Sequence, residues 1–346
     1  MDNTNAPKLL TRIKEFFVKK AASFKKNANI VRELVKKNVK IQYRNSAIGA
    51  IWTILNPLLN MLVMYFVFSN VLGYKDDKTY ALYLLCGTIT FALMRAGTTQ
   101  SMTSLVNNRG LLTKNKISYF VFPVSNNLSA VINFAFSLIA LLTVMIFVAF
   151  FNNVFEIFSP NLLLILIMLP ALFLFSYGLS LILSALYVFF RDIQHFYNVF
   201  LTLWTYLTPM FYKVDRFANS EDLSAKFITA VINLNPMYHF VEFFRDAAYR
   251  CAENTQFVAN CGELKTEFIQ KGTEMVEVTV GSSQFWDSLV SGEGMTKAIE
   301  MLETAQMYAP LPGAQEILIL YGWGIGAFLI GTLVFLLTRR KFIFYI

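Results

Sequence analysis

Long apolar runs without charge constrain the fold of this chain more than any other feature. No Asp, Glu, Lys or Arg occurs in residues 45–74, 117–155 or 157–190 of the 346-residue sequence. Each run exceeds the about 20 apolar residues that a helix needs to cross the ~30 Å hydrocarbon core of a bilayer. The strict alternation that marks the strands of membrane β-barrels is absent from them. The sequence therefore predicts an all-α integral membrane protein.

Composition agrees with a membrane fold, because 56% of the residues are hydrophobic and only 15% are charged, against about 25% charged residues in soluble domains. We expect six transmembrane helices. They cover about residues 48–72, 80–104, 124–151, 161–190, 195–213 and 315–338. In the last of them, Gly322, Gly326 and Gly331 form a small-residue face suited to close helix packing within the chain.

Charge is distributed unevenly along the sequence. Residues 1–47 hold twelve Lys and Arg and three acidic residues, a net charge of +9, whereas residues 213–313 hold eight Lys and Arg and fourteen acidic residues, a net charge of −6. Lys and Arg are enriched in the cytoplasmic loops of membrane proteins. This polarity predicts a multi-pass protein of the plasma membrane with both termini in the cytoplasm. Topology thus accounts for the overall charge of +8, which does not indicate a nucleic-acid partner.

These patterns divide the chain into five regions. They are cytoplasmic interfacial amphipathic helices at 1–47, transmembrane helices 1–5 at 48–213, an external re-entrant helical region at 214–250, an external soluble insertion at 251–313, and transmembrane helix 6 with a cytoplasmic tail at 314–346. Residues 8–26 mix Leu, Ile and Phe with Lys and Arg, as in a helix that lies in the headgroup plane of an anionic leaflet. A basic tail without fixed structure is the alternative.

Two short re-entrant helices before the last span are expected rather than another span, because Asn235-Pro236 interrupts the amphipathic pattern of that region and Pro breaks a helix. Non-helical backbone is tolerated at membrane depth only where protein or water surrounds it. In the insertion, residues 275–280 alternate like a strand and residues 296–307 have helical periodicity.

Motifs for catalysis or cofactor binding are absent from the sequence. There is no G-x-x-x-x-G-K-[ST] loop for ATP phosphates, no H-E-x-x-H pattern and no C-x-x-C pair, so we expect neither an ATP site nor a metal site in this chain. No cluster of Asp or Glu lies within the apolar segments, which argues against a proton-driven carrier. Cys251 and Cys261 could form a disulfide if their loop is external, or could remain two unpaired thiols.

Several stretches together resemble the membrane subunits of type-2 ATP-binding-cassette exporters, specifically the permeases for O-antigen, capsule and teichoic-acid export. They follow the family's order over about residues 28–250 and the final span; the 251–313 insertion departs from the family pattern. The stretches are residues 32–44 followed by Gly49, Trp52 and Asn56-Pro57; Asn108-Arg109-Gly110-Leu111-Leu112 followed by Phe122-Pro123; Phe190-Arg191-Asp192; residues 206–212; and Asn235-Pro236-Met237-Tyr238 with Glu242 and Arg245-Asp246.

The resemblance implies a homodimer of six-span subunits bound to two copies of a separate nucleotide-binding ATPase, which would bind the MgATP that this chain cannot. The implied substrate is a lipid-linked glycan or polyol-phosphate polymer moved outward across the bacterial plasma membrane. Anchoring to membrane lipids is the alternative role for the lysines of the helix ahead of the first span. The implied ATPase-coupling residues are Arg32, Glu33, Lys36, Lys37, Lys40 and Arg109.

A diphosphate headgroup needs cationic donors, preferably bidentate arginine, although topological anchoring is the simpler role for each such residue. The candidates are Arg44, Arg95, Arg109 and Arg191. Arg95 lies within a predicted span, where a charged side chain normally faces the bundle interior or water, or snorkels toward the membrane surface. Sugar polymers bind by stacking on aromatic faces, and the candidate conduit aromatics are Trp52, Tyr65, Phe175, Tyr177, Trp204 and Tyr206.

Three other functions compete with polysaccharide export. A type-2 permease for a small lipid or drug is the alternative within transport. A membrane glycosyltransferase or polymerase should show catalytic acids in a loop near the membrane, and the sequence offers no convincing set. An ion channel should show a filter-like repeat or a ring of charges, and neither is present.

Overall fold

A computed structural model of the chain describes ten segments. They are residues 27–42, 49, 51–74, 79–114, 117–152, 160–214, 223–250, 267–271, 274–278 and 314–342. Several predictions fall outside the described residues. They concern the helix at 8–26, Arg44, the cysteine pair Cys251 and Cys261, and the helical pattern at 296–307.

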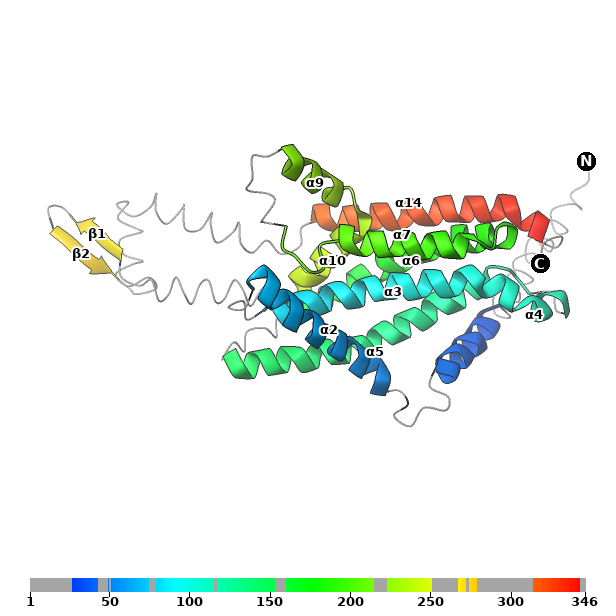
Figure 1. The fold of residues 1–346 in the computed structure, drawn as a ribbon, viewed down its shortest axis with the longest axis horizontal. Coiled ribbons are helices and arrows are strands. Elements are labelled where there is room, and N and C mark those ends of the chain that lie inside the picture. The colour runs from blue at the N-terminus through cyan, green and yellow to red at the C-terminus, as the bar shows by residue number, and fades with distance from the viewer. Residues whose placement is uncertain are drawn as a thin grey trace, which may run out of the picture.

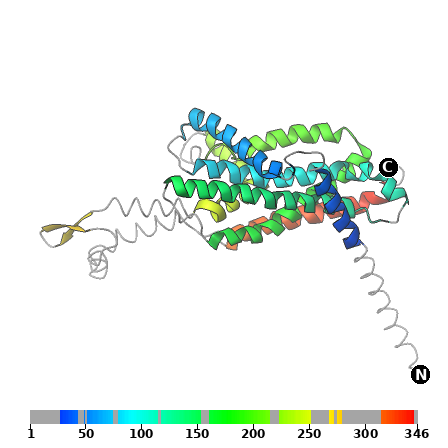
Figure 2. The same cartoon turned by 90° about the horizontal axis from the view of Figure 1, so that it is seen from below.

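Long helices form one bundle, in which α3, α6, α7 and α14 run side by side (Figure 1). The helix of residues 27–42 lies obliquely across one end of it (Figure 2). The elements are α2 (Ile51–Leu72), α3 (Tyr80–Asn107), α4 (Arg109–Lys114), α5 (Val121–Asn152), η2 (Pro160–Leu164), α6 (Ile165–Phe189), α7 (Ile193–Leu207), α9 (Leu223–Asn233), α10 (Pro236–Arg245), η3 (Asp246–Arg250), β1 (Glu267–Lys271), β2 (Glu274–Val278), α14 (Ala314–Thr338) and η4 (Arg339–Lys341). Strand β2 matches the alternation predicted at 275–280 and pairs antiparallel with β1.

Among the described residues, five helices are long and apolar enough to cross a membrane. They are α2, α3, α5, the η2–α6 segment and α14. The predicted span at 195–213 is wrong in its bounds, because α7 has 15 residues and ends at Leu207. A helix of that length reaches only ~22 Å, less than a bilayer core. The count of six spans therefore stays a prediction.

The bundle has two ends, which we call the basic end and the opposite end. The basic end is where α3 ends and α5 begins, and it carries Arg109, Lys114 and Arg191 together with the turn η4. The opposite end is where α2 ends and α3 begins. By the charge rule of the sequence, the basic end is the predicted cytoplasmic end.

Close backbone contact joins α6 to α14. A Cβ on Gly331 would collide with the backbone of Gly178, and one on Gly324 would meet the backbone carbonyl of Ala171 at 2.6 Å. Gly322 and Gly326 have open space around them instead. The predicted small-residue face is therefore wrong for Gly322 and Gly326. Gly324 and Gly331 lie on the side of α14 that faces α6.

A buried polar cluster ties α3, α5 and α6 together. The Asn127 amide on α5 donates to Ser180 Oγ at 2.8 Å and to Ser101 Oγ at 3.2 Å, and it accepts from Ser176 Oγ at 2.7 Å. A side chain on Gly97 would collide with this amide. Hydrogen bonds of this kind stabilise helix association inside a membrane by about 0.6 kcal/mol each.

Residues 208–212, which follow α7, are not helical, and side chains satisfy their backbone carbonyls. Tyr80 Oη donates to the carbonyl of Phe211 at 2.7 Å, and Tyr83 Oη donates to that of Pro209 at 2.9 Å. Arg245 Nη2 of α10 donates to the same Pro209 carbonyl at 2.8 Å. Unsatisfied carbonyls would cost several kcal/mol each at membrane depth, so these three donors allow the chain to turn back.

Arg245 is fully buried although it carries a charge. Its side chain is 1% exposed, its Nη1 contacts Glu242 Oε1 at 2.7 Å, and its guanidinium carbon lies 3.4 Å from the centre of the Tyr83 ring. Gly87 of α3 leaves room for this guanidinium, because a Cβ there would lie 3.1 Å from Nη2. The ion pair and the cation–π contact together compensate the burial of the charge.

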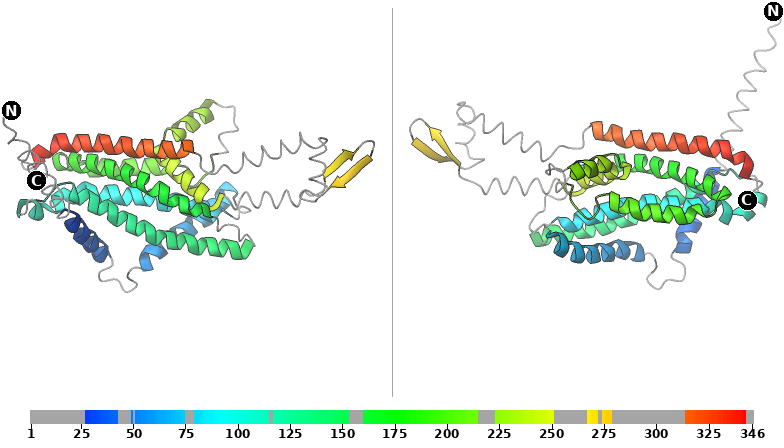
Figure 3. Two further views of the ribbon diagram at one scale, coloured as in Figure 1. Left: turned by 180° about the vertical axis from the view of Figure 1, so that it is seen from behind. Right: turned by 45° about the horizontal axis from the view of Figure 1, so that its top comes forward.

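The predicted break lies between α9 and α10, at the end of the bundle where α14 begins (Figure 3): Asn235 is the N-cap of α10 and Pro236 is its first residue. The Asn235 side chain caps α10 by accepting from the backbone N–H of Met237 at 3.0 Å, and it also accepts from Trp204 Nε1 at 2.7 Å. Its amide donates to Thr208 Oγ1 at 2.9 Å. One side chain thus caps a helix and fixes that helix to α7.

We predict that Gly331→Ala lowers the free energy of unfolding by about 1–3 kcal/mol, because the added methyl group overpacks the α6–α14 contact. Thermal unfolding in detergent would measure the change. Gly326→Ala is the matched control on the same helix, and it should leave stability unchanged or slightly raised. Equal losses in the two variants would contradict the assigned contact.

We predict that Arg245→Leu destabilises the fold by about 3–5 kcal/mol, because it removes the cation of the buried Arg245–Glu242 ion pair and one of the two side-chain donors to the Pro209 carbonyl. Unfolding by denaturant in mixed micelles, together with limited proteolysis of residues 208–250, would measure the effect. Arg245→Lys should lose less, since it keeps the charge. If exposed Arg191→Leu is equally damaging, the buried ion pair does not secure α10.

Candidate functional site: a polar stripe along α3

One face of α3 is polar and uncovered, although the rest of this helix is buried. We call it the α3 stripe: Thr88, Ala92, Arg95, Ala96, Thr99, Gln100, Thr103 and Asn107, each exposed or half-buried. Arg95 lies fifteen residues after Tyr80 and twelve before Asn107, which is ~22 Å and ~18 Å along the helix axis. The stripe therefore passes through the middle of the hydrocarbon layer.

Lipid tails cannot solvate this stripe. Threonine hydroxyls can bond their own helix, as Thr99 does by donating to the Arg95 carbonyl at 2.7 Å. The Arg95 guanidinium and the Gln100 amide have more donors than one helix can accept. Charged and amide groups at this depth normally face protein or water, so the α3 stripe faces a wet space or another subunit.

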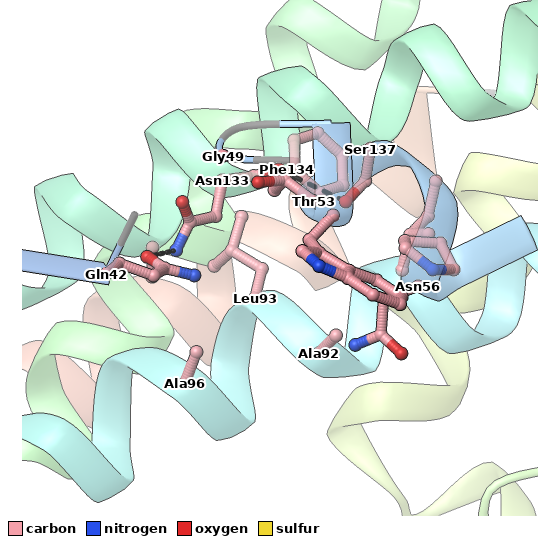
Figure 4. A pocket seen from close by; sticks show the side chains of 14 residues that line it. Gln42, Gly49, Thr53, Asn56, Ala92, Leu93, Ala96, Asn133, Phe134 and Ser137 are labelled. Carbon is pink, nitrogen blue, oxygen red and sulfur yellow. Dashed lines mark hydrogen bonds between the residues drawn. The ribbon is translucent and has the colours of Figure 1, made fainter. Parts of the chain in front are cut away.

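A cavity of about 600 Å³ lies beside the stripe, between α2, α3 and α5. We call it the α2 cavity. Figure 4 shows amide and hydroxyl side chains from three segments converging on it. The polar and aromatic residues of its wall are Gln42, Trp52, Thr53, Asn56, Asn133, Phe134 and Ser137. Gln42 Oε1 accepts from Asn133 Nδ2 at 3.0 Å (Figure 4).

The turn before α2 places Trp52 at this cavity. Gly49 has a φ of +58°, a left-handed conformation that favours glycine, and its carbonyl accepts from the backbone N–H of Trp52 at 3.4 Å. The Trp52 side chain is 45% exposed. An aromatic face beside uncharged hydrogen-bonding groups is suited to the mixed apolar and hydroxylated surface of a sugar.

A second cavity, of about 440 Å³, lies next to the α2 cavity on the side of the basic end. We call it the amide cavity. It shares Gln42 with the α2 cavity, and apart from Ile41 its wall consists of amide and hydroxyl side chains. They are Asn38, Gln42, Gln100, Thr103, Ser104, Asn107, Asn108, Asn126 and Ser129. The described walls of both cavities carry no charged side chain.

The helix of residues 27–42 forms part of the wall of both cavities and is firmly attached to the bundle. Leu34 is buried in a cluster with Leu105, Phe122 and Phe335. Asn38 Nδ2 donates to Asn126 Oδ1 at 2.8 Å. Together with the bond between Gln42 and Asn133, this contact couples any displacement of the helix to α5.

Comparison with known proteins agrees with this architecture. The family model for ABC-2 type transporters matches residues 30–249. The chain belongs to the ABC-2 type transporter family. The match begins in the helix of residues 27–42 and ends in η3, so it includes both cavities and the buried Arg245.

Three curated relatives carry the name O-antigen export system permease protein RfbA. Two are from Klebsiella pneumoniae, with 23% identity over 226 residues and 26% identity over 229 residues; each alignment covers 65% of this chain and 82% of the relative. The third is from Myxococcus xanthus, with 28% identity over 216 residues, covering 62% of this chain and 78% of the relative.

The predicted ATPase-coupling residues lie at the basic end of this ABC-2 transporter chain. They are Arg32, Glu33, Lys36, Lys37 and Lys40 on the helix of residues 27–42, and Arg109 at the start of α4, and all are exposed. Lys36 Nζ donates to Glu33 Oε1 at 2.9 Å, and this bond and the lysine charge hold the pKa of the Glu33 carboxyl below its usual value. The exposed pair contributes little to stability.

The structure separates the predicted headgroup arginines. Arg95 belongs to the α3 stripe, while Arg109 and Arg191 are exposed at the basic end. None of the three belongs to the wall of the α2 cavity or the amide cavity. No described group of His, Cys, Asp or Glu side chains could hold a metal ion.

The predicted conduit aromatics divide into two groups. Phe175, Tyr177 and Trp204 are only 3–8% exposed and pack between helices, so their rings support the core rather than a cavity wall. Trp52 borders the α2 cavity, and Tyr206 is 63% exposed on α7. Tyr65 is half-buried, with its ring 6.1 Å from that of Tyr80.

Sequence reasoning missed the amide and hydroxyl residues of both cavities. Their signal was present on α3, where Thr99, Gln100, Thr103 and Asn107 recur at the spacing of one helix face.

We predict that Gln100→Cys reacts quickly with a water-soluble maleimide in intact membranes, because thiols ionise and react only where water reaches them. The chain would carry Ser at positions 251 and 261, and the native Cys86 is fully buried. Ser101→Cys, adjacent but 0% exposed, is the first control. Phe147→Cys, exposed on α5, is a lipid-facing control. Labelling of Gln100→Cys no faster than of Phe147→Cys would place the stripe in lipid.

Proposed function

We propose that this chain is the membrane permease of an exporter that moves a lipid-linked polysaccharide outward across the bacterial plasma membrane. The observation that carries the proposal is the α3 stripe, whose amide and hydroxyl side chains and one arginine are exposed or half-buried on an otherwise buried helix. Sugar hydroxyls donate and accept hydrogen bonds, and Asn, Gln and Thr side chains can match both roles. The names of the three relatives support the same substrate class.

In this proposal a separate ATPase binds MgATP and presses on the basic end. The helix of residues 27–42 and α4 offer exposed charges there, and the bonds from Asn38 and Gln42 to α5 would carry the displacement to the cavity walls. In the same proposal, Arg109 and Arg191 would meet a diphosphate at the entrance, and Arg95 would meet charge within the path.

We propose further that two copies of the chain assemble as a homodimer with the α3 stripes facing a shared path. This arrangement would keep Arg95 away from lipid, as its depth requires. If α7 together with residues 208–212 is counted as the fifth span and α14 as the sixth, each subunit would have six spans and both termini in the cytoplasm.

A permease for a small lipid or drug is the alternative, and the wall of the amide cavity distinguishes the two. Pockets for such ligands are predominantly apolar, whereas the amide cavity has a wall of nine amide and hydroxyl residues and a single apolar one. The polar wall favours a hydroxylated substrate.

We predict that Gln100→Leu combined with Asn107→Leu lowers glycan-stimulated ATPase activity about 30-fold, because each of the two lost hydrogen bonds is worth about 1 kcal/mol. The chain would be purified in mild detergent with its ATPase partner, and lipid-linked glycan would be added. Export would be measured in parallel as polymer at the cell surface.

The matched control is Asn198→Leu, which removes an exposed amide on α7 outside both cavities and should leave stimulation unchanged. Purification of the wild-type chain without any ATPase would contradict the motor-driven permease. A stable complex that responds to small lipids and ignores glycan would favour the alternative substrate.

A further inference from the structure

An apolar groove separates the helix of residues 27–42 from the start of α5. Its volume is about 770 Å³. The α5 side consists of Val121, Val124, Leu128, Val131 and Ile132, which repeat at the spacing of one helix face. The facing side includes Val31 and Val35. The groove is distinct from the α2 cavity and the amide cavity, with which it shares no wall residue.

The groove extends along α5 over about the thickness of one leaflet. From Val121 to Ile132 is eleven residues, or ~16 Å of helix, about half of a ~30 Å hydrocarbon core. The groove begins where α5 begins, at the basic end, so its apolar wall covers the depth of an acyl chain that hangs from that membrane surface.

Two cations stand at the mouth of the groove. Arg32 and Lys36 are one helical turn apart, both border the groove and both are exposed. Arg32 forms no ion pair with any described residue, and Lys36 shares its charge with Glu33 across an exposed contact. Lys37 and Lys40 of the same helix do not border the groove.

We propose that this groove binds one anionic phospholipid of the cytoplasmic leaflet, with an acyl chain between the two helices and the phosphate against Arg32 and Lys36. The apolar wall complements the acyl chain of such a lipid, and the two exposed cations complement its phosphate. The proposal depends on the predicted orientation of the basic end but not on polysaccharide export. It separates the charges of this helix into two that bind lipid and others that face the cytoplasm.

Native mass spectrometry of the delipidated full chain tests the site with two defined lipids, phosphatidylglycerol and phosphatidylcholine. Phosphatidylglycerol should bind more tightly to one saturable site. Arg32→Gln combined with Lys36→Gln should weaken its binding about 25-fold, because each cation near the surface contributes about fivefold. Phosphatidylcholine binding should weaken much less, because the choline cation offsets the charge of its phosphate. Both side chains are exposed, so the substitutions do not threaten folding.

Lys37→Gln combined with Lys40→Gln is the matched control, with the same charge change away from the groove. It should alter phosphatidylglycerol affinity less than twofold. Equal weakening by both double variants would overturn the proposal in favour of diffuse attraction to anionic lipid. Equal affinity for the two lipids would overturn it in favour of a purely apolar contact.

A groove-filling variant gives a second, independent test. Leu128→Trp should abolish the saturable phosphatidylglycerol site, whereas Ile139→Trp, on the exposed part of α5, should keep it. A polyprenyl-linked glycan that displaces phosphatidylglycerol from the wild-type chain and is itself lost in Leu128→Trp would overturn the proposal by making the groove a substrate site.

Discussion

The fold depends on how a non-helical turn is stabilised where lipid offers no hydrogen bonds. Residues 208–212 leave carbonyls that no helix can satisfy, and donors from two distant segments reach them: Tyr80 and Tyr83 from α3, and Arg245 from α10. Because two of those three donors come from α3, the turn is fixed to the most buried of the described long helices. Pro209 ends α7, and this capture then fixes the reversal of the chain and the position of α10.

Polarity is arranged differently on the two sides of α3. On its buried side, Ser101 accepts a hydrogen bond from Asn127 of α5. Asn127 also bonds to Ser176 and Ser180 of α6, so this cluster holds the three helices together. On its uncovered side, Arg95 and Gln100 are left for water, ligand or a second subunit. The same helix is therefore both the centre of the structure and the wall of the proposed path.

Much of the architecture was predictable, because the length of an uncharged apolar run determines whether a helix can span a membrane. The break at Asn235-Pro236 was equally visible from the chemistry of proline. The end of α7 was visible in the same way, because Pro209 disfavours helix in the residue before it, although the predicted span continued through apolar residues to 213. The side chains that satisfy the carbonyls after α7 were not predictable, since they come from α3 and α10. Similarly, the glycine spacing of α14 could not show which side meets α6, and aromatic content could not show that Trp204 supports the core.

The glycine contact between α6 and α14 also limits how the protein can change shape. The backbones of the two helices are in contact at Gly178 and Gly331, so the helices cannot slide or rotate past each other without separating. They therefore move together as one rigid unit. By contrast, Ser69 is the only buried residue that the structure describes in α2. Deformation is therefore least costly at α2, which makes the outer wall of the α2 cavity the compliant part of an otherwise rigid bundle.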